Sequence, residues 1–398
     1  MTRDMLVIRF RGNSETLIGQ TLRPHFAPAD EANSTDVART CATCGQTACV
    51  RHEQRRVHRA DAAEIGRGAF LVDENWPEFQ DHIRREHQPG DVLGVPLDGA
   101  RWRLPRYRWD RWDFTHFGSA PLETISRAIE IRRAPAQGAA RRRAEQIGAE
   151  RIAARLSRLL TPDIAKVVVA QSLLPFLWRG GHLGGREVEV LMTRLPISEL
   201  QARLDRALAA HAERATLGDF RAPQELLEAE AEALAYASRI VTPHTEIARL
   251  FAEKAITLEW RQPALPQANR AAPASRRVAF PGPTVARKGA YEVREAARAL
   301  DLELVLLGSE LEGPSFWEGV KTRKFDTASS ANQWLDEVAV VVQPAIAEDR
   351  PRHLLAALAA GIPVIATPAC GLAEQHGVTM VPANDLGALI AALRASLA

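Results

Sequence analysis

The sequence predicts an α/β fold of two Rossmann-like, doubly wound domains, with an irregular metal-binding elaboration at the N-terminus. From about residue 278 onward, short β-rich runs alternate with helical segments, which is typical of a parallel sheet covered by helices on both faces. The middle third shows the same alternation less regularly, and three of the four cysteines lie within residues 41–49. With 398 residues, of which 46% are hydrophobic, the chain is long enough to form two or three hydrophobic cores.

The C-terminal domain is predicted over residues 277–398. Its β-rich runs are RVAFPG, LELVLLG, EVAVVVQPA, PVIATP and VTMVPA, and its helical segments are AYEVREAARAL, SANQWLDE, RPRHLLAALAAG and DLGALIAALRASL. Parallel sheets of this kind bind ligands beyond the carboxyl ends of their strands. Side chains that follow these runs are therefore the first candidates for a binding site.

The other Rossmann-like domain is predicted in the middle of the chain. There AKVVVAQSLL, REVEVLMTRL and RIVTP are expected strands, and a long helix is expected from about Pro223 to Ser238. Residues 13–160 carry no regular pattern apart from one very polar helix at about 138–158. We therefore expect an N-terminal region, residues 1–160, joined to the remainder of this domain, residues 161–262, with a Pro- and Ala-rich hinge at about 261–276.

Charge and hydropathy narrow the class of protein. The formal net charge is +2 and the arginines are scattered among acids, so nucleic acid is not an expected partner. The first apolar run is interrupted by arginine too soon for a signal peptide, and no stretch approaches the roughly 20 apolar residues of a membrane span. We expect a cytoplasmic protein, whose clustered cysteines bind metal rather than form disulfides.

Two segments at predicted strand ends carry candidate binding groups. Glu348 lies just past EVAVVVQPA, at the start of a helix whose first turn holds Pro351 and whose free amides carry partial positive charge. In FPGPTVARKGAYEV, Arg287 and Lys288 follow a Gly-Pro turn and precede a helix, an arrangement that suits a diphosphate. The alternatives are a Glu348 that only caps its helix and a basic loop that only contacts solvent.

The C-terminal third resembles the donor-binding half of GT-B glycosyltransferases, especially the retaining family-4 type. That family's pattern is glutamate, seven residues, glutamate, then Ala-x-Gly-x-Pro-Val-Ile-Ala-Thr. Glu348 matches the first acid, and AAGIPVIAT, residues 359–367, matches the last part. Lys288 matches the lysine that this family places on the donor diphosphate. The resemblance covers about residues 165–398 and is weaker toward its N-terminal side, which is similar to the acceptor-side domain.

The resemblance implies transfer of a sugar from a nucleotide-sugar donor to an acceptor, which is unknown. Lys288, with Arg287, is expected to neutralise the leaving diphosphate next to Gly282, and Glu348 is expected to orient the donor sugar. Pro283 replaces the arginine that usually follows this glycine. No catalytic metal is implied. The rival interpretation is a catalytically degenerate binding or scaffold protein with the same fold.

Ala356 is a further departure from the family pattern, because it stands where the second glutamate holds the ribose hydroxyls of the nucleotide. Loss of such a charge-assisted pair costs about 1.5–3 kcal/mol of donor binding. Glu310, just after LELVLLG, is a candidate replacement. If Ala356 faces the cleft, Ala356→Glu is expected to tighten nucleotide binding.

The segment TCATCGQTACVRHE is a candidate metal site. Cys41, Cys44, Cys49 and His52 follow the spacing C-x2-C-x4-C-x2-H, which can close a tetrahedral zinc shell without ligands from other segments. We predict a structural zinc ion. The alternatives are an iron–sulfur cluster on the three thiolates and uncoordinated or redox-active thiols.

Three further features are candidates on the acceptor side. His182, in the glycine-rich RGGHLGG, is predicted to reach the cleft as a catalytic residue, because glycines let a backbone approach a ligand closely. His244, after RIVTP, either caps a helix or touches substrate. The stretch ARWRLPRYRWDRWDFTHFG, residues 100–118, interleaves aromatic rings with arginines, and it is expected to cover a domain interface or to line an acceptor path.

Overall fold

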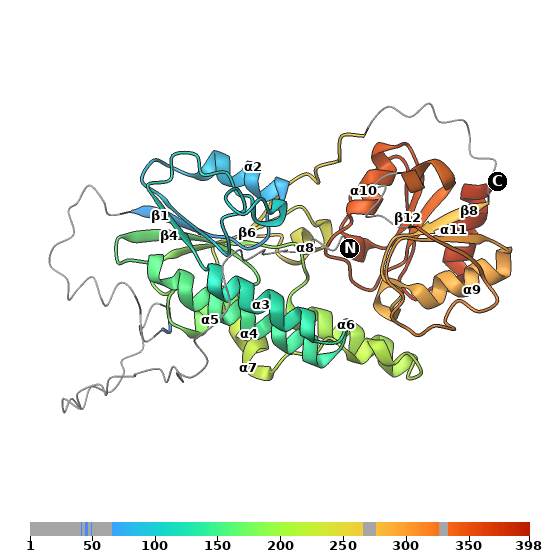
Figure 1. Ribbon diagram of the computed structural model, residues 1–398, viewed down its shortest axis with the longest axis horizontal. Coiled ribbons are helices and arrows are strands. Elements are labelled where there is room, and N and C mark those ends of the chain that lie inside the picture. Colours follow the sequence, from blue (N-terminus) through green and yellow to red (C-terminus); the bar gives the residue numbers. More distant parts are fainter. Residues whose placement is uncertain (1–40, 42–43, 47–48, 50–65, 266–275, 326–332) are drawn as a thin grey trace, which may run out of the picture.

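Two parallel sheets organise the chain, one in each of two α/β domains (Figure 1). The computed structural model describes residues 41, 44–46, 49, 66–265, 276–325 and 333–398. Within them, the N-terminal sheet has the strand order β3-β2-β1-β4-β5-β6-β7, and the C-terminal sheet has the order β10-β9-β8-β11-β12-β13. All neighbouring strands pair in parallel. The predicted fold class is confirmed.

The N-terminal sheet is buried on both faces. Its strands are β1 (Arg67–Leu71), β2 (Val92–Val95), β3 (His116–Ser119), β4 (Ile164–Ala170), β5 (Glu187–Leu191), β6 (Arg239–Thr242) and β7 (Ala255–Thr257). On one face the strands pack against α4 (Ala139–Leu156), α5 (Leu174–Arg179) and α7 (Gln224–Tyr236). On the other face they pack against α2 (Pro77–Glu86) and Trp109. The remaining α-helices are α3 (Pro121–Arg133), α6 (Ile197–Ala210) and α8 (Thr245–Leu250).

The region predicted as irregular, residues 13–160, is regular from Arg67 onward, and three of its segments are strands of this sheet. The prediction missed them because these strands are short and contain glycine, which weakens a β pattern. The glycines have a packing reason. A Cβ atom on Gly94 or Gly118 would lie 2.9 or 2.6 Å from the Leu159 side chain, so glycine lets the 3-10 helix after α4 approach the sheet. The polar helix predicted at 138–158 is confirmed as α4.

The C-terminal sheet has the same doubly wound architecture. Its strands are β8 (Arg277–Phe280), β9 (Glu303–Leu306), β10 (Lys321–Lys324), β11 (Val340–Gln343), β12 (Val364–Ala366) and β13 (Val378–Met380). One face packs against α9 (Ala290–Leu300) and α11 (Leu386–Leu397), and the other against α10 (Arg352–Ala359). All five predicted strands are present; β10, with the sequence KTRK, was missed because it is an exposed edge strand without apolar residues.

Two other predictions fall partly outside the described residues. Of SANQWLDE, residues 333–337 belong to a short 3-10 helix and not to the expected α-helix, and the preceding residues lie outside the described part. Of the predicted hinge at 261–276, residues 261–265 have no helix or strand, and 266–275 lie outside the described part.

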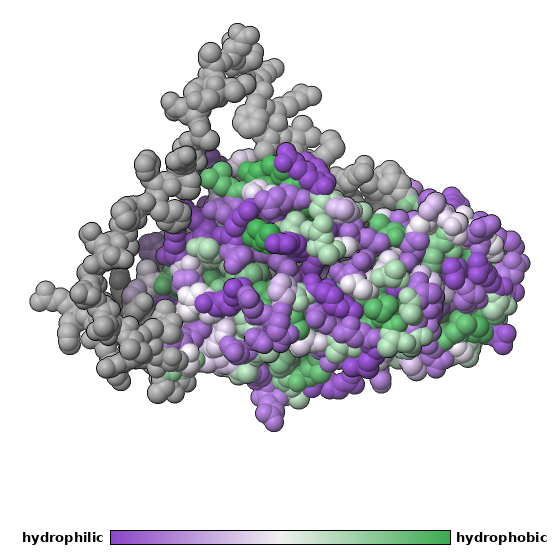
Figure 2. Space-filling view, turned by 90° about the horizontal axis from the view of Figure 1, so that it is seen from below, coloured by the Kyte–Doolittle hydropathy of each residue, from purple (hydrophilic) through white to green (hydrophobic). Residues whose placement is uncertain are grey.

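The carboxyl edges of the two sheets meet at the domain interface. His244, after β6, hydrogen-bonds the backbone at Glu348, after β11. The surface seen in Figure 2 mixes polar residues with small apolar patches, and the exposed large hydrophobic side chains among the described residues are Trp102, Leu122, Ile129 and Leu250. No helix in the described ranges is long and apolar enough to cross a membrane.

Candidate active site

Lys288 and Glu348 form a buried ion pair at the carboxyl edge of the C-terminal sheet. Lys288 Nζ lies 2.8 Å from Glu348 Oε2, and the two side chains are only 4% and 6% exposed. Glu348 Oε1 accepts hydrogen bonds from the amides of Asp349 and Arg350, at 2.9 and 2.8 Å. The side-chain amide of Gln343 also donates to Glu348 Oε2. The carboxylate therefore has four donors, as a buried charge requires.

Glycines bring the two loops that carry this pair together. Gly289 has a φ of +80°, and a Cβ atom there would lie 2.4 Å from the carbonyl oxygen of Pro344. The amide of Ile346 donates to the carbonyl of Arg287 at 2.9 Å, which joins the loop after β11 to the loop after β8. Gly282 lies beside the same pair, because a Cβ on Gly282 would be 3.3 Å from the side chain of Lys288. These loops are neighbours because their strands, β8 and β11, are adjacent in the sheet.

Arg287 points toward the N-terminal domain instead of standing beside Lys288. Its guanidinium lies 4.4 Å from the ring centre of Phe220, which follows the 3-10 helix at 215–218. Its Nε is buried without a hydrogen-bond partner among the described residues. Burial lowers the pKa of Arg287, and the charge of Asp349 opposes that effect. A buried cation with an unused donor is suited to an anionic ligand.

Glu310 does not join this group. It pairs with Lys324 at 3.1 Å and lines a separate surface groove with Gln137. Glu312, two residues later, is the acid that reaches the loop after β8, where it accepts from the amide of Ala286 at 2.7 Å and from the Tyr291 hydroxyl at 3.1 Å. The sequence does not show which of these two acids reaches the loop after β8, because the path of the chain after β9 decides it.

Ala356 does not face a cleft, so the condition for tighter nucleotide binding by Ala356→Glu is not met. It is 6% exposed and packs in the core between α10 and the sheet, with Leu355 and Val364 among the members of the same cluster. The ribose-binding role of the family's second acid therefore has no substitute at this position.

Ala356→Glu is now expected to destabilise the protein instead of tightening nucleotide binding. The new carboxylate would be buried among apolar side chains, or it would displace α10. We expect a loss of at least about 2 kcal/mol, measured as a lower thermal midpoint. Ala359→Glu, at the less buried end of the same helix, is the matched control. An unchanged midpoint together with tighter nucleotide binding would contradict the buried environment.

The structure brings His244 to the interface and leaves His182 away from it. His244 is fully buried, and its Nε2 lies 3.2 Å from the carbonyl oxygen of Glu348. Burial lowers the pKa of His244, so the neutral ring donates this bond. Gly371, with a φ of +69°, has no room for a Cβ, which would lie 2.4 Å from the ring. His182 precedes β5 and so lies at the amino edge of the N-terminal sheet, opposite the cleft.

Asp73, at the carboxyl edge of the N-terminal sheet, is an acid that the sequence analysis missed. It follows β1 and pairs with Arg127, with Nη2 3.0 Å from Oδ1, and it accepts a hydrogen bond from the Ser172 hydroxyl at 2.8 Å. Burial alone would raise the pKa of Asp73, but Arg127 outweighs it and lowers the pKa to about 2. Trp109, from the aromatic stretch, donates to the Asp73 carbonyl at 2.9 Å. The position of this acid directly after the apolar run AFLV could have identified it in the sequence as a residue at a strand end.

Two arginines after Glu348 clamp the C-terminal domain onto the N-terminal domain. Arg352 donates to both oxygens of Glu78, at 2.8 Å each, and the Glu78 side chain is 1% exposed. Arg350 pairs with Glu74. The guanidinium groups of both arginines lie 5.0 Å from the ring centre of Trp76, between these two acids. The loop that carries Glu348 is thus held from the other domain.

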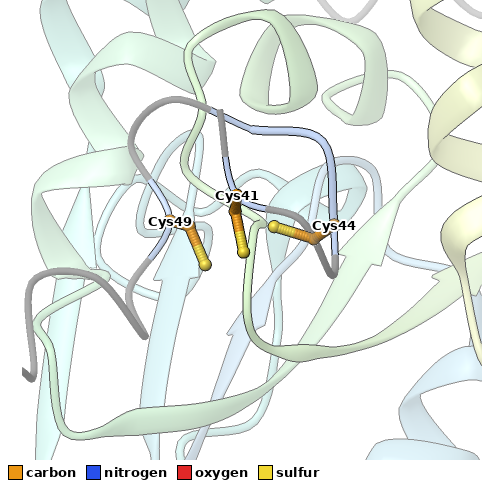
Figure 3. A group of neighbouring side chains, drawn as sticks. All are labelled: Cys41, Cys44 and Cys49. Carbon is orange, nitrogen blue, oxygen red and sulfur yellow. The ribbon is translucent and has the colours of Figure 1, made fainter. Parts of the chain in front are cut away.

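The three described cysteines of the predicted metal site converge (Figure 3). Cys41, Cys44 and Cys49 are buried, free of disulfides and grouped with their sulfur atoms within 4.8 Å of one another. His52, the predicted fourth ligand, lies outside the described residues. The cysteine segment contacts the loop between α5 and β5, at the amino edge of the sheet, so it is remote from Lys288 and Glu348.

The fold and this edge define a protein of the GT-B class. Residues 277–398, the C-terminal domain, match the family described as Glycosyl transferases group 1. Sucrose-phosphate synthase from Thermosynechococcus elongatus has the same fold, with 12% identity and a TM-score of 0.52 over 83% of this chain and 90% of that chain. Anabaena HepE in complex with UDP is 13% identical, with a TM-score of 0.48 over the same shares. No curated protein sequence matches the chain.

Proposed function

We propose that the chain is a glycosyltransferase that moves a sugar from a nucleotide-sugar donor to an acceptor held by the N-terminal domain. The observation that carries the proposal is the position of the Lys288–Glu348 pair. Both residues follow strands, β8 and β11, at which the strand order reverses, and such a switch point is where doubly wound sheets bind ligands. The fold by itself does not define an activity, so the proposal depends on these side chains.

In this proposal Lys288 and Arg287 stabilise the negative charge that develops on the leaving diphosphate. The carbonyl of Ala347 accepts from Lys288 Nζ at 3.2 Å, and this bond holds the ammonium in place when the Glu348 carboxylate moves away. The Nε of Arg287 is an unused donor in the same loop. A preorganised donor of this kind contributes about 2.7–4 kcal/mol to stabilising a transition state.

Glu348 competes with the diphosphate for the same donors. Its carboxylate accepts from the amides before α10 and from Lys288, which are the groups that suit a phosphate. Donor binding in this proposal therefore moves the Glu348 carboxylate toward the sugar, where it orients the hydroxyls. Asp73, whose pKa Arg127 helps to lower, lies after β1 at the carboxyl edge of the N-terminal sheet.

The cysteine segment has no part in this transfer. The sequence predicts a structural zinc ion, and the segment lies at the edge of the sheet opposite the proposed donor site. The predicted cytoplasmic location fits cysteines that form no disulfide, because that compartment is reducing.

A panel of nucleotide sugars, screened by thermal shift and by release of nucleoside diphosphate, tests the proposal. A donor at about 100 times its dissociation constant is expected to add about 2.7 kcal/mol of stability. The same panel with Glu348→Gln, which keeps the shape and removes the charge, reports whether this residue senses the sugar. If no nucleotide or nucleotide sugar stabilises the wild-type protein at millimolar concentration, the scaffold interpretation replaces the transferase.

A further inference from the structure

We propose that Cys41, Cys44 and Cys49 bind one zinc ion, and that the metal fastens the cysteine segment onto the glycine-rich loop between α5 and β5. This inference is independent of sugar transfer, since the site lies at the amino edge of the N-terminal sheet. It also gives the RGGHLGG segment a role, contact with the cysteine segment, that the proposed donor site does not provide.

The three thiols have the placement of metal ligands. Their sulfur atoms lie within 4.8 Å of one another, and Figure 3 shows the side chains of Cys44 and Cys49 directed toward Cys41 between them. Zinc–sulfur bonds of about 2.3 Å in a tetrahedral shell require sulfur atoms roughly 3.8 Å apart, so a small contraction is sufficient. These residues supply three of the four positions of the shell. Among the described residues, no other histidine, cysteine or acid joins the group.

Backbone hydrogen bonds hold the first two cysteines in a tight turn. Gly45 has a φ of +70°, which favours glycine, and its amide donates to the carbonyl of Cys41 at 2.8 Å. The amide of Cys41 donates to the carbonyl of Gln46 at 3.0 Å, which closes the turn. The amide of Gln46 in turn hydrogen-bonds the sulfur of Cys44. An amide donor of this kind fixes the position of a ligand sulfur.

The segment is fitted to one surface of the N-terminal domain. A Cβ on Gly184 would lie 2.6 Å from Gln46 Oε1 and 3.2 Å from Cys44 Sγ, so the glycine lets these two side chains lie close to the loop. Gln46 Nε2 donates to the carbonyl of Trp178 at 2.8 Å. Tyr236, at the end of α7, packs against the cysteines. The metal would therefore join a short segment with little core of its own to α5, α7 and the loop before β5.

The full, untagged chain tests both parts of the proposal. Elemental analysis after expression with zinc is expected to find about one equivalent of zinc, reduced at least fivefold in Cys44→Ser. Cys370→Ser is the matched control, because Cys370 is equally buried but lies in the C-terminal domain. Hydrogen exchange at residues 178–186 is expected to accelerate in Cys44→Ser and in chelator-treated wild type, with no change around residues 340–360.

Three results would overturn the proposal. They are less than about 0.2 equivalents of zinc, iron with sulfide in its place, and metal loss that leaves exchange at 178–186 unchanged. These readouts measure metal and local protection without any donor. A failed metal site is therefore distinguishable from a failed transferase.

Discussion

Replacing Lys288 with methionine is expected to abolish sugar transfer and also to destabilise the C-terminal domain. The ammonium is the buried partner of Glu348, and removing one partner of a buried pair costs about 3–5 kcal/mol. Loss of a preorganised charge at the leaving group lowers the turnover rate by about 10²–10³-fold. Donor turnover and thermal midpoint measure the two effects. The sequence alone predicts only the first, since it describes Lys288 as an open loop cation.

The double variant Lys288→Met with Glu348→Gln separates chemistry from folding. It leaves no stranded charge, so the thermal midpoint is expected to recover while turnover remains lost. Lys324→Ala is the matched control, because Lys324 belongs to the same domain but its side chain is 73% exposed. Turnover of the double variant within about threefold of wild type, equivalent to about 0.7 kcal/mol, would contradict the diphosphate role.

Arg352→Ala is expected to release the C-terminal domain from the N-terminal domain. Glu78 is nearly inaccessible, and among the described residues it would keep only the amide of Arg261, at 2.8 Å, as a donor. An uncompensated carboxylate of this kind costs about 3 kcal/mol. The stacking on Trp76 is lost as well. We expect a larger radius of gyration in small-angle scattering and a higher KM for the donor, because the loop that carries Glu348 loses its support.

Two comparison variants make this prediction specific. Arg298→Ala removes an arginine of the same domain that is 40% exposed and paired within its own helix, and it is expected to change neither property. Glu78→Gln in the Arg352→Ala background removes the stranded charge and is expected to recover stability without restoring the compact form. A radius of gyration in Arg352→Ala equal to that of wild type would show that the clamp does not hold the domains together.

The C-terminal domain was predictable because its strands carry their own signal. Runs such as VAVVV and PVIAT are buried on both faces of a parallel sheet, so they are continuously apolar and stand out from the helices between them. The N-terminal strands β2 and β3 lack such a continuous apolar pattern, because Gly94 and Gly118 interrupt them. These glycines make room for Leu159, which is about 40 to 65 residues away in the chain. The strand boundaries were sufficient to predict that Lys288 and Glu348 lie beyond strand ends.

The sequence by itself determined the fold class, the positions of Lys288 and Glu348 at strand ends and the spacing of the cysteines, because each depends on residues close together in the chain. Tertiary structure alone decided which partner each group meets. It paired Lys288 with Glu348, buried Ala356 in the core, and placed His244 rather than His182 at the interface. The physical reason is that these contacts arise where parallel strands end beside one another and where two domains meet. Neither arrangement is encoded in local periodicity.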